Sequence, residues 1–535
     1  MRILYVLMFF LMMSVTIQAQ FINNGATVTI QSGATLRVET SFINNSGTVT
    51  NNGTLEVKDN FTNAATFTSA TASTVKFIGT TPSVVTSGGA AFHHVSMEKT
   101  AQNITLADAM SVAGTLTFTN DNNKVILGAN NLTIQDGGSI ASADDNEYVV
   151  TDGAGSLIKG LSANGTYTHE IGDANNYSPL SSVVSGSYSS ATLGARVYTT
   201  GLQAKYTDAT DYINREWQVV STGITGYNNT LTGTYVAGDA TGTQSLIKGS
   251  THHTADWHFD GSSNSGQTVT ASTSTSDVKL SGQNFFGRAN LKAFLAGAMS
   301  GTSMTTTLNS ILPTTTPYTI APFNAPSVTA PSIPATATDW ILVEVRNATT
   351  PSTIISQTSA FILSNGTIVN IDGSPLRLKN AAANAHIALR HRNHLAIRTL
   401  NSMDLVNPPT LKDFSAGTGE AYTDSGISTN ANMRQMGSLY TMWNGDVNND
   451  NYVRYTDIFD FSTFTTIESD ALQVYNILGN SAAQLDGYSS KDSNFDGHVR
   501  YTDIFDFGTF TTIESDALQI YNVLGNSTNQ LQSHF

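Results

Sequence analysis

The sequence predicts a mainly β protein of several domains, followed at the C-terminal end by a small module that contains α-helices. Three observations support this prediction. Short strands of alternating apolar and polar residues recur about every twenty residues near the N-terminus. Apolar residues make up 40% of the 535-residue chain and charged residues only 12%, which leaves enough apolar surface for a folded core. An acidic loop followed by a helical pattern occurs twice near the C-terminus.

Residues 1–19 have the pattern of a secretory signal peptide. Arg2 precedes an apolar run over 3–13, and small residues end the segment near Ala19. No other stretch approaches the roughly 18 apolar residues that a membrane-spanning helix needs. We therefore expect an exported protein, extracellular or on the outer cell surface, without an integral membrane span. The chain has no cysteine, so its fold does not depend on disulfides.

Residues 20–150 are predicted to form a β-solenoid, a stack of coils resembling a parallel β-helix. Units of about twenty residues begin at Phe21, Phe42 and Phe61, and Asn-rich turns and short alternating strands follow each start. Each coil would pack its apolar face on the next coil. Asn residues at equivalent turns are expected to form ladders along the stack. A sandwich of regular hairpins is the alternative.

A β-solenoid can also carry a polysaccharide lyase, which would need carboxylates and a basic residue converging on one face. None of the five basic residues in 21–150 recurs at a spacing that would place it beside acidic residues on one face. These residues are Arg37, Lys58, Lys76, Lys99 and Lys124. The chain also lacks nucleophile-elbow, zinc-protease, Walker and dinucleotide-binding motifs. We expect no enzyme, and a catalytic sandwich without a recognisable motif is the remaining alternative.

Residues 151–290 are predicted to form a β-sandwich, because the strands lengthen and Tyr and Trp appear. Trp217 is expected in its core. His252, His253 and His258 suggest a metal site, but on one strand the first and last would lie some 20 Å apart, at about 3.3 Å per residue. A surface strand is therefore expected there. The segment 214–217, Asn-Arg-Glu-Trp, is similar to a strand of many secreted Bacteroidota surface proteins.

Residues 291–440 are predicted to form a second β-sandwich, with a proline-rich extended segment at 313–334 that no central strand could hold. His391 and His394 lie three residues apart in a predicted strand, so they are expected on opposite faces rather than at one metal ion. Four segments, 294–309, 312–318, 339–346 and 389–395, resemble a domain near the C-terminal end of exported Bacteroidota adhesin- or haemagglutinin-like proteins. The resemblance implies a surface protein whose domain leads directly into acidic loops.

Residues 441–535 contain two such loops, 446–457 and 492–503, spaced 46 residues apart. Each has oxygen-bearing side chains at positions 1, 3, 5 and 12, and position 7 offers its backbone carbonyl. Ca²⁺ prefers six to eight oxygen ligands, and this spacing can wrap them around one ion. Two Ca²⁺ sites are therefore predicted. Their expected ligands are Asp446, Asn448, Asp450, Tyr452 and Asp457 in the first loop, and Asp492, Asn494, Asp496, His498 and Asp503 in the second.

The segments that follow the loops are nearly identical, since 453–481 matches 499–527 at 26 of 29 positions. A helix is predicted after Asp470, with Ser469 or Asp470 as its cap and Gly479 at its end. Position 6 of each loop, Asn451 or Gly497, should take a left-handed backbone. The segment 458–467 between loop and helix gives no clear prediction.

The repeat pair resembles a type I dockerin, a module of paired Ca²⁺ loops and helices. The resemblance implies the same ligand sets and a protein partner of the cohesin type. Arg454 and Arg500 depart from the usual Asn at position 9, and about a dozen extra residues separate each loop from its helix.

The charge distribution agrees with cation binding at this end. Residues 441–535 carry 13 acidic and three basic side chains, a net charge of −10 out of −15 for the whole chain. An acidic chain without basic patches argues against nucleic-acid binding. The sequence therefore predicts an adhesin-like surface protein that binds glycans or another surface and has a Ca²⁺-stabilised module. The alternative is an accessory protein of extracellular polysaccharide degradation, whose dockerin-like module docks to a scaffold.

Overall fold

The computed structural model describes residues 20–535 except 199–201, 203–204, 207–208, 254–255, 260–265, 285, 380, 382–383, 406–410 and 507–509. The predicted signal peptide, 1–19, lies outside the described residues. Half of the chain lies in strands and 8% in helices, which confirms the mainly β class. The chain divides into two compact units, Met1–Asn284 and Phe285–Phe535, each with its own hydrophobic core. None of the helices in the described ranges is long and apolar enough to cross a membrane.

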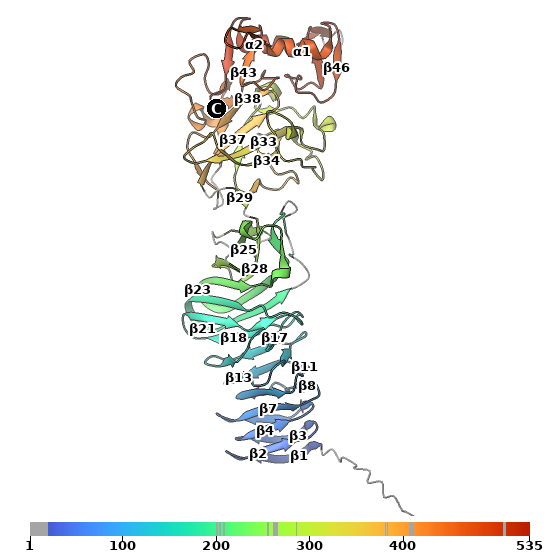
Figure 1. The fold of residues 1–535 in the computed structure, drawn as a ribbon, viewed down its shortest axis with the longest axis vertical. Helices are drawn as coiled ribbons and strands as arrows, with labels where there is room; N and C mark the ends of the chain where they lie inside the picture. Colours follow the sequence, from blue (N-terminus) through green and yellow to red (C-terminus); the bar gives the residue numbers. More distant parts are fainter. Residues whose placement is uncertain are drawn as a thin grey trace, which may run out of the picture. The chain divides into compact units, whose positions relative to one another are not determined.

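The first unit begins with a β-solenoid of about seven turns, as predicted (Figure 1). Three parallel sheets form its faces. The first contains β1 (Phe21–Ile30), β3 (Phe42–Asn51), β5 (Phe61–Asn63), β8 (Ser83–Thr86), β11 (Ile104–Leu106), β14 (Lys124–Ile126), β17 (Tyr148–Val150) and β20 (Ile171–Gly172), with β6 (Thr66–Ser69) beside β3. The second contains β2 (Thr35–Val38), β4 (Thr54–Val57), β7 (Thr74–Gly79), β10 (His94–Lys99), β13 (Thr115–Phe118) and β16 (Ser139–Ala141). The third begins with β9 (Ala91–Phe92), β12 (Met110–Val112) and β15 (Leu132–Ile134).

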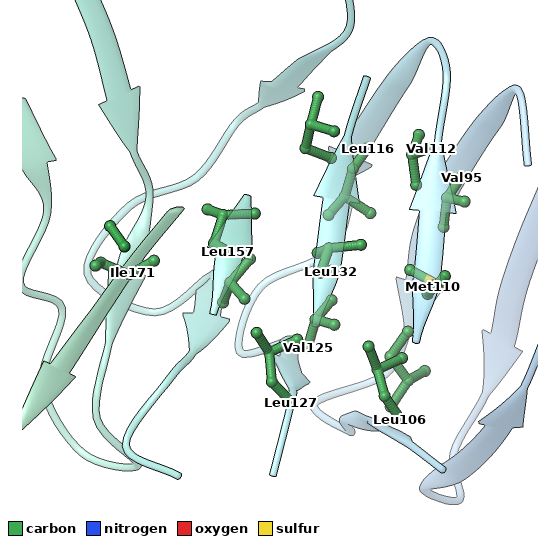
Figure 2. Close-up of a cluster of buried hydrophobic side chains, with 14 of the residues drawn as sticks. Val95, Leu106, Met110, Val112, Leu116, Val125, Leu127, Leu132, Leu157 and Ile171 are labelled. Carbon is green, nitrogen blue, oxygen red and sulfur yellow. The ribbon is translucent and has the colours of Figure 1, made fainter. Parts of the chain in front are cut away.

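Equivalent residues of successive coils stack in register, which is why the sequence repeats. Phe21 pairs with Phe42 and Leu36 with Leu55, and both ladders are parallel. The parallel ladders exclude the alternative of regular hairpins for residues 20–150. Figure 2 shows the Leu, Val and Met side chains of neighbouring coils pointing into one shared interior.

Polar and aromatic ladders run along the same stack. Asn23 Nδ2 donates to Asn44 Oδ1 at 2.9 Å, and Asn44 Nδ2 donates to Asn63 Oδ1 at 2.8 Å, so the predicted Asn ladder is confirmed. The rings of Phe21 and Phe42 stack at 5.0 Å between centroids, and those of Phe42 and Phe61 at 4.9 Å. The residues that repeat in the sequence are therefore those that hydrogen-bond or stack with each other in successive coils.

The solenoid passes into an antiparallel sheet without a break in pairing. β18 (Leu157–Leu161) is parallel to β15 on one side and antiparallel to β21 (Leu180–Tyr198) on the other. Beyond it the sheet continues through β23 (Glu216–Thr234), β27 (Thr268–Thr273), β28 (Asp277–Asn284) and β25 (Ile247–His253). One hydrophobic core extends from Ile30 to Leu280. The predicted boundary near residue 150 therefore separates parallel from antiparallel strand pairing, and one hydrophobic core continues across it.

Two local predictions for this region have different outcomes. Trp217 is fully buried, as predicted, and its Nε1 donates to the Ser178 carbonyl at 2.9 Å. The single surface strand over the histidines is wrong. β25 pairs with β26 (Asp256–His258) as a hairpin, and the rings of His253 and His258 stack at 3.8 Å. The physical reason is the antiparallel pairing of β25 with β26, which brings the two ends of the segment together.

The second unit is built on an antiparallel sheet ordered β35-β34-β33-β37-β38, with β39 beside β37 (Figure 1). Its strands are β33 (Ala337–Asn347), β34 (Ile354–Leu363), β35 (Ile368–Val369), β37 (Asn384–His391), β38 (His394–Arg398) and β39 (Met403–Asp404). Trp340 and Tyr318 lie in its core, and the Trp340 Nε1 donates to the Pro313 carbonyl at 2.8 Å. The proline-rich segment 313–334 contains no strand, as predicted.

The C-terminal repeats each contribute a loop strand, a hairpin, a helix and a tail strand. The first copy contains β43 (Tyr452–Arg454), β44 (Ile458–Asp460), β45 (Thr465–Ile467), α1 (Asp470–Leu478) and β46 (Gln484–Asp486). The second contains β47 (His498–Arg500), β48 (Ile504–Asp506), β49 (Thr511–Ile513), α2 (Asp516–Leu524) and β50 (Gln530–Gln532). Each tail strand pairs with the loop strand of the other copy, β46 with β47 and β50 with β43.

Both predicted helices form where expected. Ser469 caps α1 and Ser515 caps α2, each through a side-chain oxygen that accepts from a backbone N–H three residues later at 3.2 Å. Gly479 and Gly525 end the helices in the left-handed conformation. The undecided segment 458–467 is the hairpin β44–β45, which forms a two-stranded sheet of its own.

Candidate metal loops

The two acidic loops place the first predicted ligand of each copy in the interior of the second unit. Asp446 is buried, and Asp492 is fully buried. Val453 and Val499, at position 8, are also fully buried and belong to the core between the two helices. Position 6 takes a positive φ in both copies, 70° at Asn451 and 84° at Gly497, which confirms that prediction.

Within each loop, the predicted ligands at positions 1, 3 and 5 fold back onto the backbone of the loop. Asn448 Oδ1 accepts from the N–H of Asp450 at 3.0 Å, and Asp450 Oδ1 accepts from the N–H of Tyr452 at 2.9 Å. The second copy repeats this arrangement, as Asn494 Oδ1 accepts from Asp496 N at 3.1 Å and Asp496 Oδ1 from His498 N at 2.8 Å. These bonds hold the side-chain oxygens on the concave side of a tight loop.

The aspartate at position 1 of each loop also accepts a hydrogen bond from the backbone of the loop. Asp446 Oδ1 accepts from Asp450 N at 3.1 Å, and Asp492 Oδ2 accepts from Gly497 N at 3.1 Å. The other oxygen of Asp492, Oδ1, is buried and has no hydrogen-bond partner. A buried, unpaired carboxylate oxygen is costly unless a cation or donor satisfies it.

The arginine at position 9 of each loop has a role that the predicted ligand pattern does not include. Arg454 Nη1 donates to Asp450 Oδ2, and Arg500 Nη1 donates to Asp496 Oδ2. Each arginine therefore neutralises the carboxylate at position 5 of its own loop. Tyr452 and His498, at position 7, are the first residues of the loop strands β43 and β47.

Asp457 and Asp503, the predicted ligands at position 12, lie at the surface. Each lies at the base of its exposed hairpin, and its Oδ1 accepts from the N–H of the helix-capping serine, Ser469 or Ser515, at 2.8 Å. The structure therefore does not bury these two carboxylates beside Asp446 and Asp492. The extra residues noted in the sequence are the hairpins that separate position 12 from the helix.

Two further carboxylates, which sequence spacing missed, do reach the loops. Asp470 and Asp516 are the first residues of α1 and α2, and both are fully buried. Asp470 accepts from Val447 N and from Arg454 N, both at 2.8 Å. The signal for them in the sequence is the Ser-Asp pair at the start of each helix, which by itself predicts only a cap.

The buried carboxylates raise one another's pKa values. Burial, and then the neighbouring Asp470 and Asp450, raise the pKa of Asp446 well above its usual range. Burial raises the pKa of Asp470 to about 7 and that of Asp492 to about 6. Burial and the nearby Asp492 raise the pKa of Asp516 to about 8. Each loop is thus a site of concentrated negative potential that a cation would relieve.

The chemistry of this donor set suits a hard divalent cation. Carboxylate and amide oxygens are the ligands that Ca²⁺ prefers, and the unpaired Oδ1 of Asp492 has room for one more partner. Among the described residues, no group of three or more His, Asp or Glu side chains converges closely enough to hold a metal as the side chains stand. The loops would therefore have to close around the ion, with Asp450 and Asp496 turning from their arginines.

The turn between β37 and β38 contacts both loops. Gly445 N, directly before the first loop, donates to the Asn393 carbonyl at 3.0 Å, and Asn449 Nδ2 in that loop donates to the Arg392 carbonyl at 3.0 Å. In the second copy, Asn393 Nδ2 donates to the Asp492 carbonyl at 2.7 Å. The sheet of the second unit thus holds both loops through two adjacent residues.

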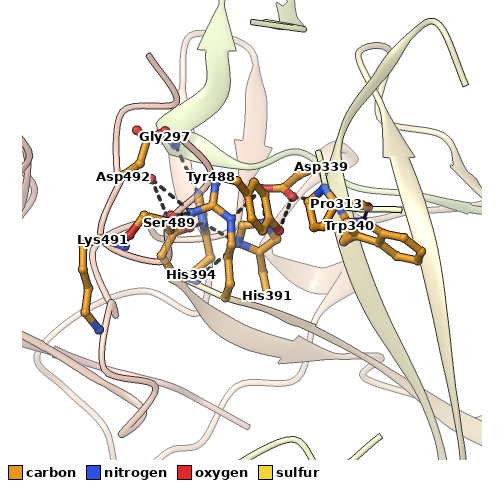
Figure 3. A network of polar contacts seen from close by, with 12 residues as sticks. Gly297, Pro313, Asp339, Trp340, His391, His394, Tyr488, Ser489, Lys491 and Asp492 are labelled. Atoms are coloured by element: carbon orange, nitrogen blue, oxygen red, sulfur yellow. Dashed lines mark hydrogen bonds and ion pairs between the residues drawn. The ribbon is translucent and has the colours of Figure 1, made fainter. Parts of the chain in front are cut away.

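A buried polar network strengthens the attachment of the second loop (Figure 3). The Asp339 carboxylate accepts from Arg392 Nε at 2.8 Å, His391 Nε2 at 3.1 Å and the Tyr488 hydroxyl at 2.8 Å. Burial alone would raise the pKa of Asp339, but Arg392 and the bond from His391 bring it below its usual value. Phe495, at position 4 of the second loop, lies in the core of the sheet beside Arg392.

This network corrects the prediction for the two histidines. His391 and His394 do not lie on opposite faces of one strand, because the chain turns at 392–393 and they pair across the hairpin. Their Nδ1 atoms lie 3.1 Å apart and both rings are buried. His394 Nε2 accepts from Gly297 N at 3.2 Å, so the pair is held by protein groups.

The hairpins between loop and helix expose aromatic side chains. Phe461, Phe464 and Phe510 are each 78% exposed. The two hairpin sequences, 458–467 and 504–513, differ at one position of ten, although four of the first seven loop residues differ between the copies. No family model, curated protein or solved structure matches this chain.

Proposed function

We propose that this chain is an exported, adhesin-like binding and structural protein of the cell surface, whose C-terminal repeat pair binds two Ca²⁺ ions. The single observation that carries the Ca²⁺ proposal is the buried Oδ1 of Asp492, which has no hydrogen-bond partner in a loop lined by carboxylates. Burial of a carboxylate oxygen without a partner costs free energy. The surrounding carboxylates favour a cation as that partner.

The role of the ions in this proposal is structural. The two loops contact the turn at 392–393 and contribute to the same unit as the sheet. Ca²⁺ that binds only the folded loops would stabilise the second unit by mass action. The ions would make no contact with a reacting group, so binding rather than turnover is the function proposed.

The binding role is supported by the polar faces of the first unit. Hydroxyl pairs lie across neighbouring strands, such as Thr192 with Thr222 at 2.7 Å and Thr230 with Ser272 at 3.1 Å. A shallow depression of about 510 Å³ on the antiparallel sheet is lined almost entirely by Ser, Thr and Asn side chains. Such surfaces offer hydrogen-bond donors and acceptors to glycans, and binding on a glycan array without product release would support this part of the proposal.

The Ca²⁺ proposal is tested by calorimetric titration of the chelator-treated chain. We expect two ions per chain, one fewer in each of the Asp446→Ala and Asp492→Ala variants, and none in the double variant. Replacement of the exposed Asp486 by Ala is the matched control, because it removes a carboxylate from the same region outside the loops. A wild-type chain that takes up no Ca²⁺ would refute the proposal.

A second candidate function is docking to a scaffold protein in extracellular polysaccharide degradation. The exposed Phe461, Phe464 and Phe510 favour it, because two almost identical hairpins offer a protein partner two equivalent apolar contacts. Binding of a cohesin-type domain, lost in Phe461→Ser plus Phe464→Ser, would support this function. Absence of binding at micromolar concentrations would leave only the adhesin-like role.

A further inference from the structure

We propose that Asp470 and Asp516, the first residues of α1 and α2, are the last carboxylate ligands of the two cation loops, in place of Asp457 and Asp503. This inference rests on the proposed Ca²⁺ function, and it assigns the residues that complete each site.

The same contacts occur in both copies. Asp470 spans the first loop from position 2 to position 9 through its bonds to Val447 N and Arg454 N. Asp516 spans the second in the same way, accepting from Ser493 N at 2.6 Å and from Arg500 N at 2.8 Å. Each carboxylate therefore lies across the loop and fixes its two ends.

Both carboxylates keep capacity for a further partner. A carboxylate oxygen has two lone pairs. Oδ2 of Asp470 accepts only the N–H of Arg454, and Oδ2 of Asp516 only that of Arg500, among the hydrogen bonds of the described residues. The remaining lone pair on each can face a cation, as the terminal carboxylate does in loops of this class.

An independent observation at the second site points to a cation there. The unpaired Oδ1 of Asp492 is fully buried, and the N–H of the next residue, Ser493, donates to Asp516 Oδ1 at 2.6 Å. Two buried carboxylates in adjacent positions cost free energy without a counter-ion, which a divalent cation bound by both would recover.

An ordinary helix-end role does not account for Asp470 and Asp516. A carboxylate in the first turn favours a helix by interaction with its dipole, but an exposed carboxylate gives that benefit without loss of hydration. Both residues are fully buried, while the capping bonds are made by Ser469 and Ser515. The burial of these two carboxylates therefore indicates a role other than stabilising the start of the helix.

The hairpins explain why sequence spacing selects the wrong aspartates. In a loop that leads straight into its helix, position 12 is at the start of the helix. Here, β44–β45 lies between Asp457 and α1, so the start of the helix is reached at Asp470. Asp457 closes the base of the hairpin through its bond to Ser469 N, which is a structural role.

The test compares matched substitutions in the full chain. Asp470→Asn plus Asp516→Asn removes one charge from each site, and Asp457→Asn plus Asp503→Asn removes the same charges from the hairpin bases. We expect the first pair to weaken Ca²⁺ binding at least about tenfold at both sites, because even outer-shell changes cost tenfold or more. The second pair should change the affinities less than about threefold.

The single variants give an internal control for folding. In Asp470→Asn the second site should keep its wild-type affinity, and in Asp516→Asn the first site should. If an Asn variant does not fold, Asp470→Glu and Asp457→Glu, which keep the charge, provide the same comparison. Wild-type Ca²⁺ uptake that is lost in Asp457→Asn and kept in Asp470→Asn would overturn this assignment alone. No uptake by the wild-type chain would overturn the proposed function as well.

Discussion

At the scale of single residues, Asn44 shows how the solenoid uses polar side chains in its interior. It is fully buried, donates to Asn63 Oδ1 at 2.8 Å and to the Thr66 carbonyl at 3.0 Å, and accepts from Asn23. Its neighbour Asn45 makes a similar bond to Asn24 at 2.9 Å, but on the exposed side of the same strand, β3. The two residues therefore differ in burial more than in bonding.

Replacement of Asn44 by Ala should destabilise the first unit by about 1–3 kcal/mol, because it leaves the side-chain Oδ1 of Asn63 unpaired in the interior and removes one of the two bonds of the Asn23 amide. Replacement of Asn45 by Ala should cost less than about 0.5 kcal/mol, since water can satisfy Asn24. Urea unfolding of both variants measures the difference. Equal effects would mean that burial does not determine the strength of the ladder.

The contacts of a few single residues differ from those that the sequence predicts. The local pattern predicts only a helix cap at Asp470, and it places His391 and His394 on one strand. Both errors have one physical cause, which is that contacts across a turn or an inserted hairpin are not visible in local spacing. The turn at 392–393 consists of Arg and Asn rather than Gly or Pro, so no strong turn signal was present.

At the scale of elements, the hairpins β44–β45 and β48–β49 are separate two-stranded sheets at the surface. Replacement of 458–467 and 504–513 by short Gly-Gly turns should leave Ca²⁺ affinity unchanged and shift the melting temperature of the second unit by less than about 3 °C, because little buried area is lost. Calorimetry and Ca²⁺ titration of the trimmed chain measure both quantities. A loss of Ca²⁺ binding would show that the hairpins shape the loops.

The sequence predicted the elements that local patterns determine. The solenoid strands repeat every twenty residues, and the helices have a serine cap and a terminal glycine, so both were found. The segment 458–467 gives no clear prediction because Phe and Thr recur in it without a clear period of two or of 3.6. Its exposure explains the difficulty: apart from Phe459, whose side chain is not described, no side chain of the hairpin is buried, so the hairpin needs no alternation of apolar and polar residues.

At the scale of the whole molecule, the two units have separate hydrophobic cores. Scanning calorimetry of the full chain should therefore show two transitions, and Ca²⁺ should raise only the one that belongs to the second unit. With 1 mM Ca²⁺ and a dissociation constant of about 10 μM, each site adds about 2.7 kcal/mol, which corresponds to at least about 10 °C for two sites.

The double variant Asp446→Ala plus Asp492→Ala identifies the transition that responds, because only that transition should lose its dependence on Ca²⁺. A single transition that shifts as a whole would contradict the division into two units. The sequence predicts three boundaries, near residues 150, 290 and 440, and the division between the two units lies close to the second of them. The other two do not separate compact units, because one core extends across residue 150 and the turn at 392–393 holds both loops.

The exchange of tail strands between the two repeats makes each repeat depend on the other. β46 completes the loop strand of the second copy, and β50 completes that of the first. One copy alone would leave both its tail strand and its loop strand without these partners. The duplication in the sequence is therefore a requirement of the fold, because the two copies form one interlocked module.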